Sequence, residues 1–102
     1  MKQQSPVPVT LINLFGVLAG SENEFVEWWE KSSALLTQEP GFIDATLHRS
    51  IQPDTNFQFI NVAHWESTEA LDLARAKHAE VLRSFSKAKG RPGVYEVVSH
   101  YA

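Results

Sequence analysis

Residues 57–67 read FQFINVAHWES, a strand pattern that leads directly into the start of a helix. Side chains alternate between the two faces of a strand, so positions 57, 59, 61, 63 and 65 share one face and positions 58, 60, 62, 64 and 66 share the other. Both faces hold large apolar side chains, which is typical of a strand that is covered on both sides. The first face also carries Asn61 and Trp65, the two side chains in this stretch best suited to bind a small molecule.

Three further stretches have the composition of strands, and they are residues 9–17, 42–51 and 94–101. Residues 52–56, QPDTN, are rich in turn formers and predict a hairpin that joins the second stretch to the strand at 57–66. Residues 87–93, KAKGRPG, hold two glycines, a proline and three basic side chains. We therefore expect a basic loop there, followed by the last strand at 94–101.

Two stretches with an apolar stripe at helical spacing lie between the strands. The first covers residues 21–36 and begins with Ser21 and Glu24 in the pattern of a capping box. The second begins at Ser67, again a cap residue, and an interruption is predicted near Lys77. The order βαββαβ predicts an α+β ferredoxin-like fold, in which two helices cover one face of a four-stranded antiparallel sheet.

One domain at residues 9–102, preceded by a flexible lead-in at residues 1–8, accounts for the whole length of 102 residues. The net charge of −3 gives no reason to expect a nucleic acid or an anionic membrane as partner. The chain has no cysteine, no clustered histidines and no glycine-rich phosphate loop, so we predict no metal, no flavin and no other cofactor. It has no signal peptide and no apolar run long enough to span a membrane, which predicts a cytoplasmic protein.

The second face of the sheet needs a cover that two helices on the first face do not supply. The strands at 9–17 and 57–66 are apolar on both faces, and Ile12, Leu14, Ile60 and Val62 lie on the second. A second copy of the chain packed sheet to sheet would cover them, which predicts a homodimer. A different protein as partner fits the same pattern.

Three segments resemble the antibiotic biosynthesis monooxygenase (ABM) family: INLF at 12–15, EPGFIDATLHRS at 39–50 and FQFINVAHWESTEAL at 57–71. The resemblance implies a dimeric α/β barrel with a pocket between the sheet and the helices of each subunit. Some members of the family oxidise polycyclic phenols to quinones with O₂, without metal or flavin. Others degrade haem or act on small quinols or signalling molecules.

In the quinone-forming members, a strand asparagine and a tryptophan four residues later bind the substrate and assist its deprotonation, and the resemblance gives these roles to Asn61 and Trp65. A tyrosine early in the next helix falls at about Leu71, so that phenol donor is missing here. A later basic residue corresponds to Arg83 or Lys87. The quinone-forming pattern is thus matched in part.

In the haem-degrading members, an asparagine of the first strand matches Asn13. Their helical tryptophan falls at about Ala74, and their haem-ligating histidine has no clean equivalent, although His78 lies a few residues away. These departures count against haem degradation.

Oxygenation without a cofactor needs an electron-rich substrate that reduces O₂ itself once it is ionised, so the protein has to orient it, donate hydrogen bonds and exclude water. We predict Asn61, Trp65 and His78 as catalytic groups, with His78 as proton acceptor because histidine titrates near neutral pH. The predicted substrate contacts are Asn13, Phe15, Phe59, Trp28 and Leu71. Each residue also has a structural explanation, since the amides can satisfy irregular backbone and the apolar side chains can be plain core.

The sequence therefore predicts an oxidoreductase that acts on an aromatic, phenolic or quinol-like small molecule. Two other classes stay open. One is an enzyme of the same fold that is not an oxygenase, such as an isomerase or a haem-handling protein. The other is a non-catalytic dimeric protein that binds a small ligand.

Overall fold

The computed structural model describes residues 7–102, so the predicted lead-in at residues 1–8 lies mostly outside the described part of the chain. Residues 7 and 8 have no regular structure. The helices and strands follow in the order β1 (Val9–Val17), α1 (Glu22–Leu36), β2 (Phe42–Arg49), β3 (Phe59–Trp65), α2 (Thr68–Lys77), α3 (Ala79–Leu82) and β4 (Ala88–Tyr95).

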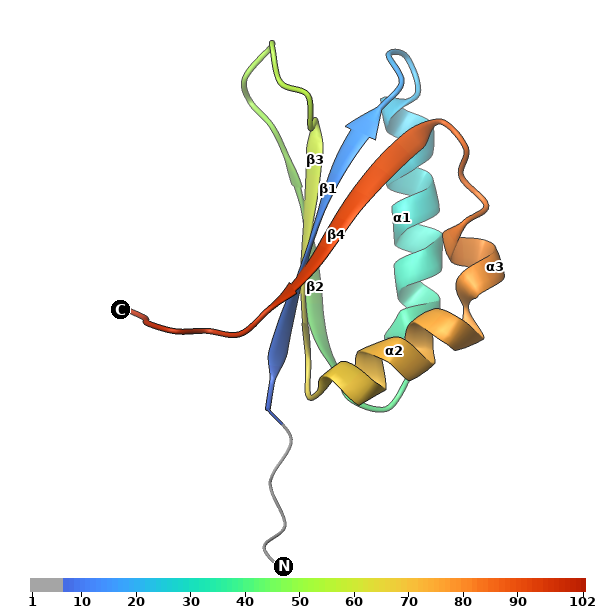
Figure 1. Cartoon of the computed structure of the whole chain (residues 1–102). Helices are drawn as coiled ribbons and strands as arrows, with labels where there is room; N and C mark the ends of the chain where they lie inside the picture. The colour runs from blue at the N-terminus through green and yellow to red at the C-terminus, as the bar shows by residue number, and fades with distance from the viewer. Residues whose placement is uncertain (1–6) are drawn as a thin grey trace, which may run out of the picture.

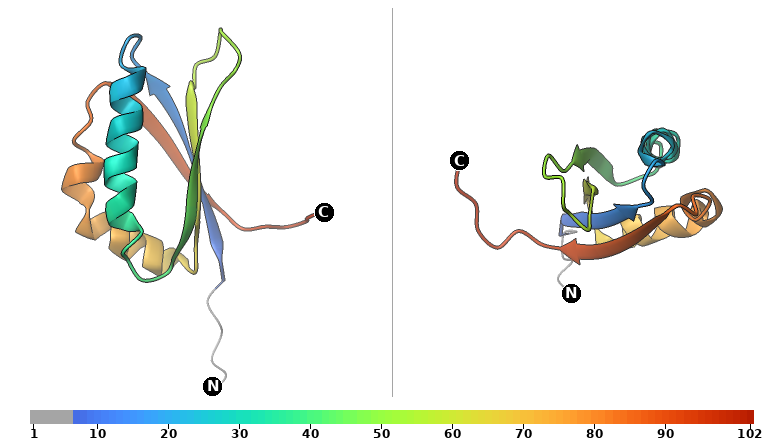
Figure 2. Two further views of the ribbon diagram at one scale, coloured as in Figure 1. Left: turned by 180° about the vertical axis from the view of Figure 1, so that it is seen from behind. Right: turned by 90° about the horizontal axis from the view of Figure 1, so that it is seen from above.

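The four strands form one antiparallel sheet in the order β2-β3-β1-β4, and the helices all lie on one of its faces (Figures 1 and 2). This confirms the predicted α+β ferredoxin-like arrangement. The interruption predicted near Lys77 is also present, because α2 ends there and the single turn of α3 follows after His78. No helix in the described range is long and apolar enough to cross a membrane.

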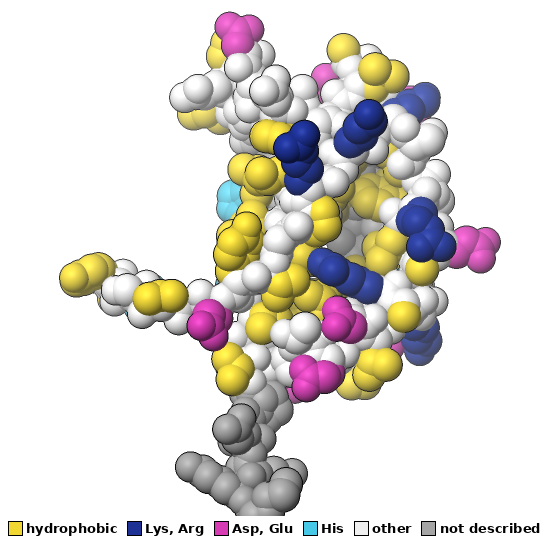
Figure 3. Space-filling model, in the orientation of Figure 1, with side chains coloured by type: hydrophobic (Ala, Val, Ile, Leu, Met, Phe, Trp, Pro, Cys, Tyr) yellow, Lys and Arg dark blue, Asp and Glu magenta, His cyan; other side chains and the backbone are white. Residues whose placement is uncertain are grey.

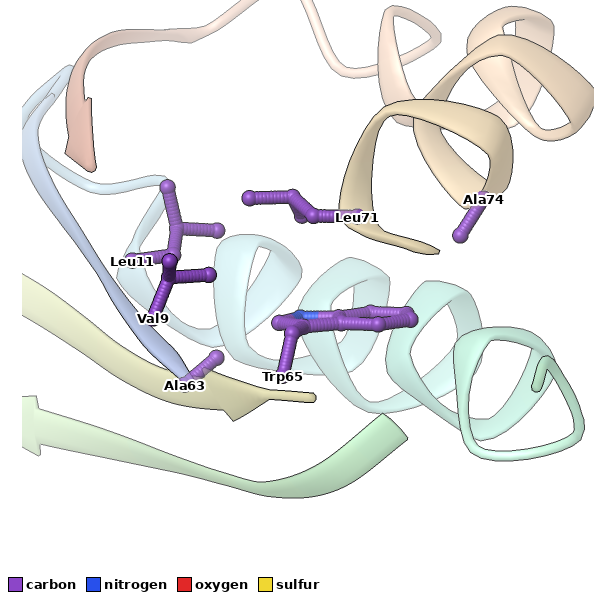
Figure 4. Close-up of a cluster of buried hydrophobic side chains, with 6 residues drawn as sticks. All are labelled: Val9, Leu11, Ala63, Trp65, Leu71 and Ala74. Carbon is purple, nitrogen blue, oxygen red and sulfur yellow. The ribbon is translucent and has the colours of Figure 1, made fainter. Parts of the chain in front are cut away.

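The alternation predicted for β3 is confirmed. Phe59, Ala63 and Trp65 are buried on the face toward the helices, whereas Ile60 and Val62 are half-buried on the opposite face. Trp65 is the largest side chain in the core beneath α2, where its ring lies between the sheet and the α2 side chains (Figure 4). The buried members of this cluster are Val9, Leu11, Ala63, Trp65, Leu71 and Ala74.

The last strand differs from its prediction. β4 covers Ala88–Tyr95, so most of the residues predicted as a loop are part of the strand and pair with β1. Residues 96–102 have no regular structure and run away from the sheet (Figure 1). Glycine and proline normally mark loops, but here each is compatible with the strand. Pro92 lies on an edge strand, where a missing N–H costs no ladder bond. A Cβ at Gly90 would lie 2.9 Å from Asn13 Oδ1, and one at Gly93 would lie 2.6 Å from the Tyr95 hydroxyl, so neighbouring side chains occupy both spaces.

The two helix caps also differ from each other. Ser67 is extended, with φ −161° and ψ 162°, and its hydroxyl accepts a hydrogen bond from the amide of Ala70 at 3.1 Å, as predicted. Ser21 has φ −106° and ψ 13°, and its side chain makes no cap hydrogen bond. The predicted capping box is therefore wrong, because a cap side chain reaches the first turn from an extended backbone that Ser21 does not adopt.

Candidate functional site

A cavity of about 650 Å³ lies between the sheet and the helices. It is within the size range of small-molecule sites, and its wall is mostly hydrophobic. Figure 3 shows this face of the molecule, where hydrophobic side chains line a hollow and Lys or Arg side chains stand around it. All four strands contribute to the floor, while α1, α2 and α3 form the wall and roof.

Two amides meet on the floor of this cavity. Asn13 on β1 is directly opposite Asn61 on β3 in the ladder, and both side chains line the cavity. Oδ1 of each is buried, and neither finds a hydrogen-bond partner within residues 7–102. Buried polar atoms are nearly always satisfied, so this pair of unpartnered amides is the strongest sign of a binding site in the molecule.

Trp65 lies four residues beyond Asn61 on the same strand face and lines the same cavity. It is only 1% exposed and packs edge-on against Phe42, with ring centroids 5.3 Å apart. Its indole N–H donates to no group in the described range, so this donor is free for a ligand. Leu71 of α2 also lines the cavity and contributes an apolar contact.

An aromatic wall closes the cavity on the side of α1. The indole N–H of Trp28 donates to the backbone carbonyl of Val81 at 3.0 Å, which ties α1 to α3. The Trp28 ring stacks on Phe85, with centroids 5.8 Å apart and an interplanar angle of 30°. Phe15 lines the same wall from β1. A planar ligand therefore meets flat aromatic surfaces along this side of the cavity.

Six of the eight predicted site residues line the cavity, and they are Asn13, Phe15, Trp28, Asn61, Trp65 and Leu71. Phe59 does not line it. Its ring is 2% exposed and packs in the core against Phe25, with centroids 4.8 Å apart, so the structure places it behind the cavity wall rather than in contact with a ligand.

His78 does not line the cavity either, contrary to its predicted position. Helical spacing put it on the apolar stripe, but α2 ends at Lys77 and His78 forms its C-cap. The side chain turns instead to the α1–β2 connection, where Nε2 lies 3.0 Å from Oε2 of Glu39. Lys77 Nζ lies 3.2 Å from the same carboxylate oxygen. The structure thus gives His78 a partner outside the site and no contact with a ligand in the cavity.

This cluster predicts a dependence of stability on pH. The hydrogen bonds from His78 and then Lys77 lower the pKa of the Glu39 carboxyl below its ordinary value. The resulting stabilisation is present above the ordinary carboxyl pKa and is lost as the pH falls through the folded-state value. We expect Glu39→Gln to lower the free energy of unfolding at pH 7 and to have a smaller effect near pH 3, because the Glu39 carboxyl of the unfolded chain is then largely protonated. Urea unfolding over a pH series measures the difference.

The matched control is Glu27→Gln, which removes the exposed pair with Lys31 at 3.1 Å within α1. Such pairs contribute little, so this variant should follow the unsubstituted protein at every pH. Equal destabilisation by Glu39→Gln at both pH values would contradict a role for the carboxylate charge.

Three further residues line the cavity that the sequence did not predict there or predicted only as one of two alternatives. Arg75 of α2 and Arg83, the C-cap of α3, both line the cavity, whereas Lys87 pairs with Glu24 at 3.2 Å outside it. Of the two basic residues suggested by the resemblance, Arg83 is therefore the one at the site. Arg75 follows Leu71 by four residues, which places both on one helix face, and this spacing was the available signal. Gly90 of β4 also lines the cavity, although the composition of residues 87–93 predicts a loop there.

No group of three or more metal-ligating side chains comes together in residues 7–102. The cavity lining holds no histidine, cysteine, methionine or tyrosine, which are the side chains that commonly ligate haem iron. The residues present therefore do not fit the iron ligation of a haem protein.

Comparison with known proteins relates the chain to one family. The family model described as antibiotic biosynthesis monooxygenase matches residues 8–90. Deoxynogalonate monooxygenase from Streptomyces nogalater is 31% identical over 86 residues, which cover 79% of this chain and 70% of that protein.

Solved structures agree with this relationship. A candidate monooxygenase from Shewanella loihica superposes with a TM-score of 0.84 at 35% identity, covering 96% of this chain and 100% of that one. SnoaB from Streptomyces nogalater, a cofactor-independent oxygenase, has a TM-score of 0.76 at 26% identity and covers 92% and 96%. MhuD from Mycobacterium tuberculosis, a haem degrader solved with two haems bound, has a TM-score of 0.69 at 28% identity and covers 92% and 99%.

Proposed function

Because the chain belongs to the antibiotic biosynthesis monooxygenase family, we propose that it is a cofactor-independent monooxygenase of an aromatic, phenolic or quinol-like small molecule. The observation that carries this proposal is the pair of opposed amides, Asn13 and Asn61, whose buried oxygens have no partner on the floor of a mostly apolar cavity. Similarity to SnoaB, a cofactor-independent oxygenase, supports the same class of reaction.

The geometry suits a substrate that is its own reductant. A flat ring system packs along Trp28, and a hydroxyl at its inner end donates to one amide oxygen and accepts from an amide N–H. When the substrate hydroxyl gives its proton to solvent, the amide N–H and the free N–H of Trp65 stabilise the resulting anion. The anion then reduces O₂. One oxygen atom enters a ring CH₂ carbon as a carbonyl, and the other leaves with the two hydrogens as water.

Oxygen uptake tests the proposal. The purified protein, in buffer with EDTA and without added flavin, is given a panel of hydroxyanthrones, naphthols and hydroquinones, and the uncatalysed rate is subtracted. We expect at least one member to give uptake of one O₂ per quinone formed without release of hydrogen peroxide, which a hydroquinone oxidised without oxygen insertion would produce. If no member of the panel raises uptake above the uncatalysed rate, the oxygenase proposal fails and a non-catalytic binding protein is favoured.

Haem handling is the alternative suggested by the similarity to MhuD. Since the lining of the cavity offers no iron ligand among the usual side chains, we expect added haemin to show no ligated Soret band. A sharp, stoichiometric Soret shift would favour the alternative.

We also propose that the chain works as a homodimer formed through the open face of the sheet. Ile12, Leu14, Ile60 and Val62 are half-buried there, and no helix covers them. Residues 96–102 leave the body on the side of this open face (Figure 2), and they carry Val97, Val98 and Tyr101 at exposures of 71% to 95%. Apolar side chains left uncovered on an isolated chain support an interface with a second copy.

Val62→Asp tests the dimer. We expect light scattering to give a mass near twice the 11.5 kDa of the chain for the unsubstituted protein, and a much weaker dimer for the variant, because the charge would be buried against apolar partners. Leu73→Asp is the control, since Leu73 is 73% exposed on α2 and away from the sheet. A monomer mass for the unsubstituted protein at micromolar concentration would contradict the proposed dimer.

A further inference from the structure

We propose that the cavity selects anionic ligands and that its substrates carry a carboxylate, which Arg75 and Arg83 bind. The proposal rests on the proposed function only in taking this cavity as the substrate site. It goes beyond that function because it adds a charge requirement to the aromatic ring system.

The charges of the lining carry the proposal. Arg75 and Arg83 are the only charged residues among those that line the cavity, and the lining contains no aspartate or glutamate. The chain as a whole has twelve acidic and nine basic residues, with a net charge of −3. A cavity with two positive charges and no negative one is therefore set apart from the rest of the molecule, and it attracts anions.

Within the described residues, the two arginines also form no ion pair with an acidic side chain. Lys31, Lys77 and Lys87 each lie within 3.2 Å of a carboxylate oxygen, and Arg49 and Arg91 stand over aromatic rings. Within residues 7–102, neither cavity arginine has a carboxylate within 4.0 Å. Arg75 is half-buried and Arg83 is exposed, and no acidic side chain of the described residues serves as a counter-ion for either guanidinium. A ligand carboxylate would supply this counter-ion, because the planar guanidinium can donate two parallel hydrogen bonds to the two oxygens of a carboxylate.

The break between the helices brings the two arginines to one cavity. Arg75 lies in the last turn of α2, the chain changes direction after His78, and Arg83 caps the short α3 that follows. The amide pair lies on the floor, on β1 and β3, and the arginines belong to the helices that roof it. The arrangement fits a ring system that has its ionisable hydroxyl at one end and a carboxylate at the other.

A binding experiment without oxygen tests the proposal separately from turnover. The probes are 6-hydroxy-2-naphthoate, which has its hydroxyl and its carboxylate at opposite ends of the ring system, its methyl ester and 2-naphthoate, and calorimetry under nitrogen gives each Kd. Trp28, Trp29 and Trp65 are all the tryptophans of the chain and all line the cavity, so quenching of their fluorescence reports binding at this site. We expect the two carboxylates to bind the unsubstituted protein at least about 10-fold more tightly than the ester.

The variants identify the groups responsible. Arg75→Gln and Arg83→Gln should each weaken binding of both carboxylates by about 10-fold or more and leave the ester unchanged. Added salt should weaken the carboxylates and not the ester. Lys87→Gln removes the same charge from the same region but outside the cavity, so it should leave all three affinities unchanged.

Three results would overturn the proposal: equal affinity for ester and carboxylate, an effect of Lys87→Gln as large as that of the arginine variants, or a loss confined to the ligands that carry a phenol hydroxyl. The last would show that the arginines hold the ionised phenol instead. A carboxylate preference without oxygen uptake from any substrate would leave this proposal standing and remove the oxygenase function. Oxygen uptake without a carboxylate preference would do the reverse.

Discussion

Asn61→Ala is expected to lower the rate of oxygenation about 10²-fold or more, the usual effect of losing one donor that stabilises a developing anion. The same substitution should leave the free energy of unfolding unchanged or slightly higher. Oδ1 of Asn61 is buried without a partner, so its removal breaks no hydrogen bond of the folded chain and relieves an unsatisfied group. A large loss of rate without a loss of stability is the signature of a residue that works on a ligand.

The matched control is His64→Ala, on the same strand but on the opposite face of the sheet. His64 Nδ1 lies 2.6 Å from Oδ1 of Asp44, and this exposed pair has no contact with the cavity. Its loss should change the rate little once both proteins are compared at concentrations where they have the same mass by light scattering. An essential His64 beside a dispensable Asn61 would show that the chemistry lies on the other face.

The central strand could be predicted because its structure follows from local pattern. Alternation with period two, together with apolar residues of both parities, is enough to put Asn61 and Trp65 of β3 on one buried face. The same pattern put Asn13 on a neighbouring strand with the same orientation. Only the ladder register shows that the two amides are directly opposite each other, because register depends on the pairing of two segments far apart in the chain and not on either segment alone.

β4 could not be predicted from its own residues. Its composition is that of a loop, and its strand structure depends on β1, against which it pairs from Ala88 to Tyr95. Gly90 leaves room for the Asn13 side chain, so a residue that looked like a loop signal turns out to shape the site. Tertiary contacts of this kind override local propensity, and no window of sequence contains them.

How well the helical side of the site could be predicted depended on where α2 ends. Periodicity gave Leu71 correctly, but it extended the stripe through His78, which lies just past the last residue of α2. A position one residue past the helix end is enough to turn the His78 side chain from the cavity to Glu39. Arg75, inside the helix, follows the period and reaches the cavity. The position of a helix terminus is the least certain part of such a prediction, since it depends on the caps and not on the stripe.

Phe25→Ala is expected to lower the free energy of unfolding by about 3–5 kcal/mol, the usual cost of a cavity left by a buried aromatic ring. Phe25 is 0% exposed, and its ring centroid lies 4.8 Å from those of Phe15 and Phe59. A domain of this size has a total stability of about 5–15 kcal/mol, so this one change removes a large share. Urea unfolding at a fixed protein concentration measures it, because a dimer makes the midpoint depend on concentration.

The control for packing is Leu73→Ala on the exposed side of α2, where the loss should stay within about 0.5 kcal/mol. Phe25→Leu fills most of the volume and should fold even if the alanine variant does not. Phe25 is outside the cavity lining but packs against Trp28 and Phe85, which form its aromatic wall at centroid distances of 5.6 and 5.9 Å. The leucine variant should therefore bind the methyl ester of 6-hydroxy-2-naphthoate more weakly, since the aromatic wall of its cavity is no longer supported from behind. Unchanged stability and unchanged affinity in both variants would show that the wall holds its position without Phe25.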